Sequence, residues 1–128
     1  MRPHYLPYPL DWVDQQLDQL SAALPRIGRL FIYDPIFAVR QRHTLEIGQM
    51  MARYHFQFGA ECRVDAAWLP RVIPQLREMG LEMIFWGIES ASADTLLRMG
   101  KVRSRAQAAR YVKRALAVLE ACFQNDVT

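Results

Sequence analysis

Charged and hydroxyl side chains follow three short apolar runs of this sequence, and these side chains are the ones that could do chemistry. They are Asp34, Arg63 with Asp65, and Glu89 with Ser90 and Ser92. A carboxylate such as Glu89 can accept hydrogen bonds from two hydroxyl groups, and a cation such as Arg63 forms charge-assisted bonds with anionic groups. If the fold brings the three segments together, they predict a ligand site with polar and charged walls.

The three apolar runs have the composition of strands. We expect strands at 30–33, 60–64 and 83–88. The last run is apolar throughout, which predicts that both faces of its strand are covered, as in a parallel sheet.

Apolar residues at helical spacing predict four helices around these strands. One begins after Pro9 and stops before Pro25, one is capped by Thr44, one covers 69–79, and one runs roughly from 105 to 123. The inner stripe that we expect on the last helix is Ala109, Val112, Leu116, Leu119 and Phe123.

A helix followed by three strand–helix units predicts an α/β fold with right-handed parallel crossovers. The carboxyl ends of parallel strands share one rim, where such folds bind ligands, and the polar segments lie at these ends. A three-stranded parallel sheet leaves two edges unpaired. Either the chain stops short of a complete fold or something else covers those edges.

Composition narrows the class of protein. The chain has 128 residues, 52% hydrophobic and 23% charged, which fits one globular domain rather than a disordered segment. No signal-like segment and no apolar run near 18 residues occurs, so we expect neither secretion nor a membrane span. Two cysteines without metal-ligand spacing disfavour disulfides and zinc and indicate a reducing cytoplasm.

The strand ends resemble motifs of the radical S-adenosylmethionine (radical SAM) enzymes. Segment 33–37 is similar to the family's D-[DP]-x-F strand end, 63–65 to its R-x-D strand end, and 87–92 to its G-[IV]-E-S-[GA]-S turn. Segment 96–101 resembles the L-x-x-M-x-K that follows. The likeness covers roughly residues 10–120 and is closest to the branch often fused to cobalamin-binding domains.

The resemblance implies a fold, an activity and a set of pocket residues. Family members use a partial or full (β/α) barrel and a [4Fe–4S] cluster on a C-x-x-x-C-x-x-C loop to cleave S-adenosylmethionine reductively. Carried over by motif, Glu89 would lie near the ribose hydroxyls, Arg63 would reach into the same pocket, and Lys101 would pair with the methionine carboxylate. Ser90 and Ser92 would be weaker polar contacts, and cobalamin is a possible further cofactor.

The sequence departs from the family at the cluster. It contains no C-x-x-x-C-x-x-C, and Cys62 and Cys122 cannot supply three thiolates at one site. We therefore expect residues 1–128 to form one partial (β/α) TIM-barrel segment with about three parallel strands and four helices, residues 1–9 being irregular. It would contribute part of the S-adenosylmethionine pocket and would be inactive alone, with the rest of the barrel or another protein covering its sheet edges.

Two other functions stay open. The chain could be a non-catalytic α/β module whose sheet edges dock on another protein. Less favoured is anion or nucleic-acid binding through the basic segment 101–114, where Tyr111 is the only interleaved aromatic residue.

The candidate residues also have purely structural interpretations. Ser90 or Ser92 could cap a helix, Arg63 and Asp65 could form a surface ion pair, and Asp34 could form a turn before Pro35. Cys62 fits a buried apolar position. His4, His43 and His55 have no metal-ligand spacing.

Overall fold

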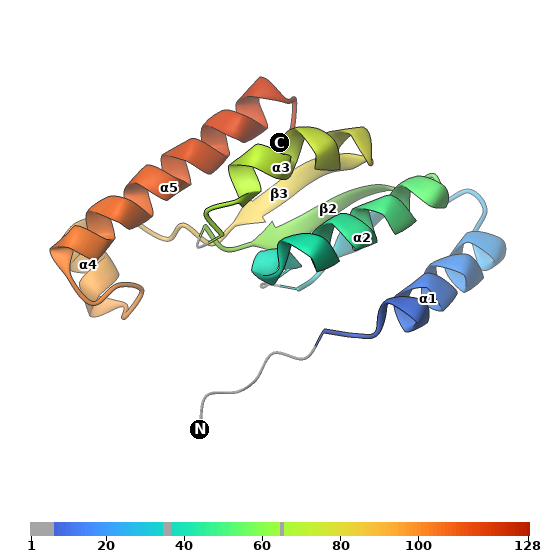
Figure 1. Ribbon diagram of the computed structural model, residues 1–128, viewed down its shortest axis with the longest axis horizontal. Helices are drawn as coiled ribbons and strands as arrows, with labels where there is room; N and C mark the ends of the chain where they lie inside the picture. Colours follow the sequence, from blue (N-terminus) through green and yellow to red (C-terminus); the bar gives the residue numbers. More distant parts are fainter. Residues whose placement is uncertain (1–6, 35–36, 65) are drawn as a thin grey trace.

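The computed structural model describes residues 7–34, 37–64 and 66–128, which fold into a parallel sheet with helices packed along it (Figure 1). The elements are α1 (Leu10–Ala23), β1 (Arg29–Ile32), the 3-10 turn η1 (Phe37–Val39), α2 (Gln41–Arg53), β2 (Gln57–Cys62), α3 (Leu69–Glu78), β3 (Leu81–Trp86), α4 (Ala93–Arg98) and α5 (Arg105–Gln124). The predicted α/β class with three parallel strands is confirmed.

The strands lie in the order of the sequence, β1-β2-β3, so each crossover moves one place in the same direction. Leu30 is in register with Phe58, and Ala60 with Ile84. Because all pairs are parallel, the carboxyl ends of the strands share one rim. The polar segments singled out in the sequence follow these ends.

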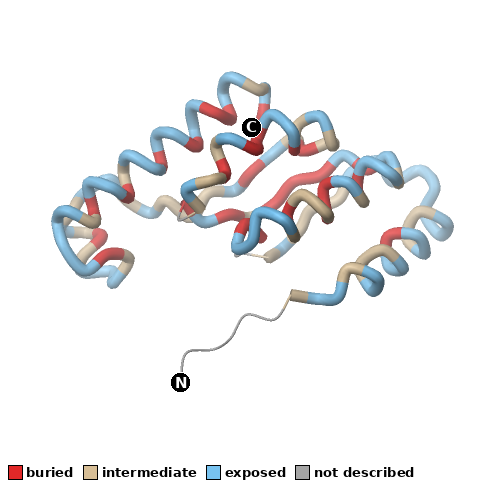
Figure 2. Tube along the Cα trace, in the orientation of Figure 1, coloured by how far each residue is buried: buried red, intermediate tan, exposed pale blue. Residues whose placement is uncertain are grey.

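The core lies on one face of the sheet, between the strands and helices α2 and α3 (Figure 2). Phe58 and Leu81 point to this side and are at most 1% exposed. The opposite face carries Met83 and Phe85, which are 39% and 61% exposed. The expectation that β3 is covered on both faces is therefore wrong for the described chain. Crossovers of one hand and one direction place their helices on a single face.

A second apolar cluster joins α4 and α5 to the rim. Its buried members are Val64, Leu96, Val102, Ala108, Tyr111, Ala115 and Val118. The predicted inner stripe of α5 is therefore wrong by one position, since Leu116 and Phe123 are 63% and 86% exposed. Small residues on the buried stripe let α5 approach α3 closely, and the larger apolar residues face outward.

Two further details differ from expectation. Thr44 lies inside the first turns of α2 rather than at its cap, and its buried hydroxyl is within 3.0 Å of the Phe37 carbonyl and 3.1 Å of the Arg40 carbonyl. Residues 93–98 form the additional short helix α4. Among the helices of the described ranges, none combines the length and apolarity needed to cross a bilayer.

Candidate functional site at the strand ends

The chain turns sharply after β3. The Gly87 amide donates to the Cys62 carbonyl at 3.0 Å, which ties the turn to the end of β2. Glu89 then adopts a φ of 66°, in the left-handed region that a residue with a Cβ rarely occupies. Such a conformation costs of the order of 1 kcal/mol and persists only where neighbouring contacts fix it. The turn therefore holds the Glu89 carboxylate at the rim.

Lys101 reaches the same place from the end of α4. The Gly100 amide donates to Leu97 and the Lys101 amide to Leu96, and Gly100 has a φ of 70°. This is the Schellman arrangement, in which a left-handed glycine ends the helix and sets the direction of the next residue. The Lys101 Nζ lies 3.0 Å from the Glu89 Oε1. The structure thus joins two residues that the sequence placed in one site.

Tyr111, which sequence reasoning did not assign to the site, supports the turn from α5. Its hydroxyl lies 2.8 Å from the Gly87 carbonyl and 3.1 Å from the Ile88 carbonyl, and the residue is 7% exposed. A buried tyrosine hydroxyl needs a hydrogen-bond partner, and the turn carbonyls provide it. A tyrosine among the apolar residues of this helix could have indicated such a contact. Tyr111 was missed because it lies on the stripe of α5 next to the one that we expected to be buried.

Ser90 and Ser92 both have structural tasks at the start of α4. The Ser92 amide donates to the Ser90 Oγ at 3.0 Å, and the Thr95 amide donates to the Ser92 Oγ at 3.4 Å. Ser92 is the N-cap of α4, as its structural interpretation predicted. Each hydroxyl still has a proton to donate to a ligand.

The other candidates lie at the neighbouring strand ends. Arg63 comes directly after β2 and is exposed. Asp34 follows β1, and its carbonyl accepts a hydrogen bond from the Phe37 amide at 2.9 Å, which fits its predicted turn role. Residues 35 and 36 of segment 33–37 and Asp65 of segment 63–65 lie outside the described residues.

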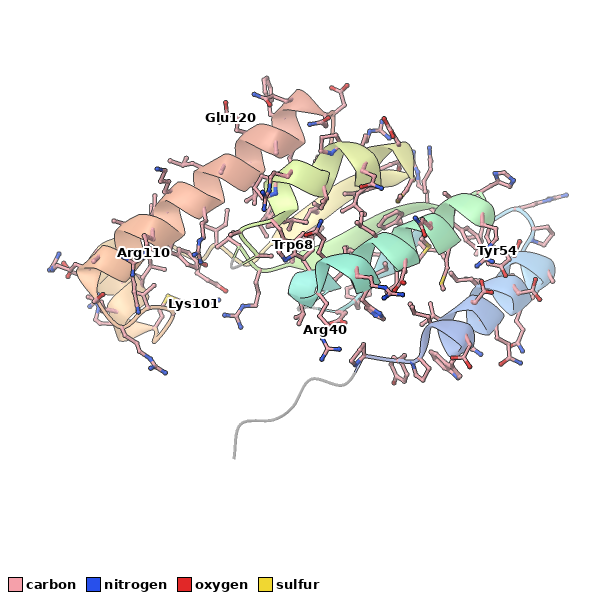
Figure 3. The ribbon with its side chains drawn as sticks, in the orientation of Figure 1. Arg40, Tyr54, Trp68, Lys101, Arg110 and Glu120 are labelled. Atoms are coloured by element: carbon pink, nitrogen blue, oxygen red, sulfur yellow. The ribbon has the colours of Figure 1, made fainter. Side chains whose placement is uncertain are left out.

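A positively charged cavity of about 260 Å³ adjoins Lys101. Its lining residues are Lys101, Val102, Gln107, Arg110, Tyr111 and Arg114. Figure 3 shows Lys101 and Arg110 at the same end of the molecule. The cations favour an anionic ligand, whereas the buried Tyr111 ring offers no exposed face for base stacking.

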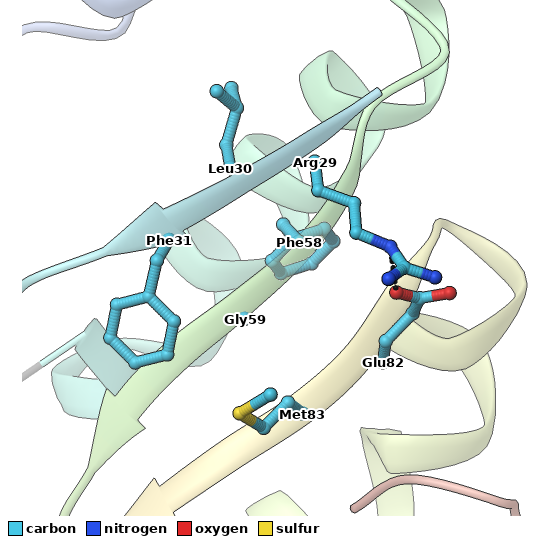
Figure 4. Close-up of a pocket in the computed structure, with 7 residues that line it drawn as sticks. All are labelled: Arg29, Leu30, Phe31, Phe58, Gly59, Glu82 and Met83. Carbon is cyan, nitrogen blue, oxygen red and sulfur yellow. Dashed lines mark ion pairs between the residues drawn. The ribbon is translucent and has the colours of Figure 1, made fainter. Parts of the chain in front are cut away.

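Another cavity, of about 240 Å³, lies on the open face of the sheet (Figure 4). Arg29 and Glu82 form an ion pair of 3.0 Å beside it, and Phe31, Gly59 and Met83 form its apolar floor. Arg29 begins β1 and Glu82 is second in β3, so this cavity lies toward the amino ends of the strands. It is therefore separate from the Glu89–Lys101 site.

The cysteines do not fit an iron–sulfur cluster. Cys62 and Cys122 are free thiols, 1% and 5% exposed. Burial raises the pKa of Cys62 to about 12, with a further increase from the neighbouring Cys122, and burial also raises the pKa of Cys122. Cluster ligands are thiolates. Within the described ranges no three His, Cys, Asp or Glu side chains are grouped to hold a metal ion.

The raised pKa of Cys62 predicts a loss of stability at high pH. Well below pH 9, the ordinary pKa of this thiol, the group is protonated in both the folded and the unfolded chain, so its contribution to stability is constant. Between pH 9 and about 12 the unfolded chain releases this proton while the folded chain keeps it, and the free energy of unfolding falls. Urea unfolding of Cys62→Ala should show a shallower decline over this range than the parent. Parallel declines in the two proteins would contradict the prediction.

The fold and site define a parallel α/β protein. The rim at the carboxyl ends of its strands holds the Glu89–Lys101 ion pair beside a cationic cavity. Comparison of the chain with family models, with curated proteins and with solved structures gives no match. Any assignment of function therefore rests on the residues themselves.

Proposed function

We propose that the chain is a (β/α)-barrel segment of a radical SAM enzyme and contributes part of the pocket for S-adenosylmethionine. The observation that supports this most is the Glu89–Lys101 pair at the carboxyl rim. Both residues come from motifs that resemble those of the family, although they are 12 positions apart. The sequential strand order and one-sided helix layer are compatible with a barrel segment.

The pair has the chemistry to hold the two polar ends of the ligand. One Glu89 oxygen faces Lys101, which leaves the other to accept hydrogen bonds from ribose hydroxyls. The Lys101 ammonium has further N–H donors for the methionine carboxylate. The two side chains are 41% and 26% exposed, and an ion pair of this kind contributes only about 0–1 kcal/mol. A ligand can therefore share or replace the pair at small cost.

The remaining pocket roles follow from position. Arg63 at the end of β2 would be a second cation, and the hydroxyls of Ser90 and Ser92 would donate weaker hydrogen bonds. The [4Fe–4S] cluster and the reductive cleavage of S-adenosylmethionine would belong to the complete family fold, because the thiols of this chain do not suit a cluster. Cobalamin remains an inference from the branch resemblance, and a reducing cytoplasm is the setting that suits two free thiols.

Calorimetric titration with S-adenosylmethionine tests the proposal. We expect the parent chain to bind and Glu89→Gln to bind roughly ten- to hundredfold more weakly, since a hydrogen bond to a charged group contributes about 1.5–3 kcal/mol. Glu120→Gln is the matched control, because Glu120 lies on α5 away from the site (Figure 3). Equal affinity of Glu89→Gln and the parent would remove the site assignment, and a parent that does not bind at millimolar ligand would contradict the proposal.

The open face of the sheet favours a second candidate function, that of a protein-interaction module. Phe85 and Tyr33 are 61% and 85% exposed, and Phe31 packs against both with ring centroids 5.6 and 4.7 Å away. An exposed apolar patch of this kind is typical of contact surfaces. This function predicts a well-folded monomer or homodimer that does not bind S-adenosylmethionine.

A further inference from the structure

Helix α5 turns one side of its first half toward the cationic cavity of about 260 Å³. Gln107, Arg110 and Arg114 line the cavity from positions i, i+3 and i+7, which share one face of a helix. Lys101 reaches it from the loop before α5, and Figure 3 shows this residue at the same end of the molecule as Arg110. Two segments of the chain therefore bring basic side chains to one hollow.

The two arginines of the cavity have no carboxylate partner. Lys101 is paired with Glu89 at 3.0 Å. Within the part of the chain that the structure describes, neither Arg110 nor Arg114 has an ion pair or a side-chain hydrogen bond, and no acidic residue lines the cavity. Like charges at i and i+4 of a helix repel each other. A bound anion would remove this repulsion.

The chain orients Gln107 as a further donor. The Arg103 amide donates to the Gln107 Oε1 at 2.6 Å, and the Gln107 backbone amide donates to the Ser104 Oγ at 3.2 Å. Because only the oxygen of a side-chain amide can accept a hydrogen bond, the first contact fixes which way the Gln107 amide points. Its NH₂ group is left to donate to a ligand. Lys101, Gln107 and the two arginines thus all offer N–H groups.

This combination of charge and donors favours a phosphate group. A guanidinium binds two phosphate oxygens in a fork, and a phosphate monoester carries a charge of about −1.5 to −2 at pH 7. That charge matches Arg110 and Arg114 together, whereas a carboxylate would neutralise one of them. A nucleic-acid strand fits less well, because the buried Tyr111 ring offers no face on which a base could stack.

We infer that this cavity binds the phosphate group of a small phosphorylated molecule. Arg110 and Arg114 hold the phosphate oxygens, and Gln107 donates one more hydrogen bond. The inference narrows the anion-binding function of segment 101–114 to one face of α5. It does not depend on the proposed binding of S-adenosylmethionine, which carries no phosphate.

Calorimetric titration with inorganic phosphate at constant ionic strength tests the site. We expect the parent chain to bind, and Arg114→Gln to bind about tenfold more weakly, since it loses a charge-assisted hydrogen bond. Lys113→Gln is the matched control. It removes the same charge from the adjacent position, which lines a different hollow on α5, so its affinity should stay within about twofold of the parent. Acetate, with one charge and two oxygens, should bind the parent at least about tenfold more weakly than phosphate.

Three results would overturn the inference. The first is a parent chain that does not bind at about 10 mM phosphate. The second is an equal loss in Arg114→Gln and Lys113→Gln, which would show a diffuse attraction of anions. Binding of single-stranded RNA that both substitutions weaken equally would then assign the basic segment to nucleic acid instead.

The third is weaker phosphate binding by Glu89→Gln, which would place the anion at the Glu89–Lys101 pair. The inference predicts that Glu89→Gln binds phosphate at least as tightly as the parent, because this change removes the carboxylate beside Lys101. The same substitution is expected to weaken binding of S-adenosylmethionine. The two proposals can therefore fail independently of each other.

Discussion

Phe58→Ala should lower the free energy of unfolding by about 3–5 kcal/mol, whereas Phe85→Ala should lower it by about 1 kcal/mol. Both residues are phenylalanines in neighbouring strands, Phe58 near the start of β2 and Phe85 near the end of β3, and they point to opposite faces of the sheet. Phe58 is 1% exposed and packs edge-on against Phe37, so its removal leaves a cavity in the core. Phe85 is 61% exposed and loses chiefly its contact with Phe31.

Urea unfolding of the two variants and the parent measures this asymmetry. The control is built in, because the same atoms are removed from the same residue type in both variants. A loss for Phe85→Ala as large as that for Phe58→Ala would mean that the open face is covered in solution. Sedimentation at the same protein concentration then shows whether a second copy covers it.

The elements of the fold could be predicted because their signals are local. The helical spacing of Leu10, Val13, Leu17 and Leu20 coincides with α1, and the apolar runs coincide with the strands to within three residues at their ends. Strand–helix alternation was enough to predict the parallel sheet, because antiparallel neighbours need only a short turn. The rim position of Glu89 follows from the same reasoning.

Which face of a helix or strand is buried could not be predicted in the same way. Helix α5 has apolar residues on two stripes, and periodicity does not distinguish the stripe that carries Ala115 and Val118 from the one that carries Leu116 and Leu119. The choice is made by packing, since small side chains allow α5 to lie close to α3. The buried Tyr111 and its bonds to the turn were missed for this reason. Likewise the apolar composition of β3 does not show that only one face is covered.

The site was predicted in part. Glu89 and Lys101 were assigned to one pocket through the motif resemblance, whereas helix α4 and its stop at Gly100, which set the direction of the chain at Lys101, were not predicted. The left-handed conformation of Glu89 was not predicted either, because glutamate rarely adopts it. It is imposed by tertiary contacts, namely the Gly87 bond to Cys62 and the Tyr111 hydroxyl. The Glu89–Lys101 contact depends on these contacts as much as on the motif.

Gly80→Ala should destabilise the protein by about 3 kcal/mol, because both the backbone conformation and the space at this position exclude a methyl group. Gly80 links α3 to β3 with a φ of 104°, and a Cβ there would lie 2.7 Å from the Phe56 carbonyl oxygen and 3.5 Å from the Gln57 Cα. These are backbone atoms at the start of β2, and the Gly80 carbonyl also accepts a hydrogen bond from the Phe58 amide at 2.8 Å. Relief of the clash would therefore break the pairing at the start of β2.

The variant Gly100→Ala separates the cost of the backbone conformation from the cost of the steric clash. Gly100 has a φ of 70°, but a Cβ at this position has no atom within 4 Å, so only the conformational cost of about 1 kcal/mol remains. Thermal or urea unfolding should therefore place Gly80→Ala well below Gly100→Ala in stability, with the parent highest. Equal losses would show that the clash at Phe56 is relieved by movement of the α3–β3 link. The pairing of β2 with β3, and with it the bond from Gly87 to Cys62 that fixes Glu89, would then be looser than the hydrogen bonds of this link indicate.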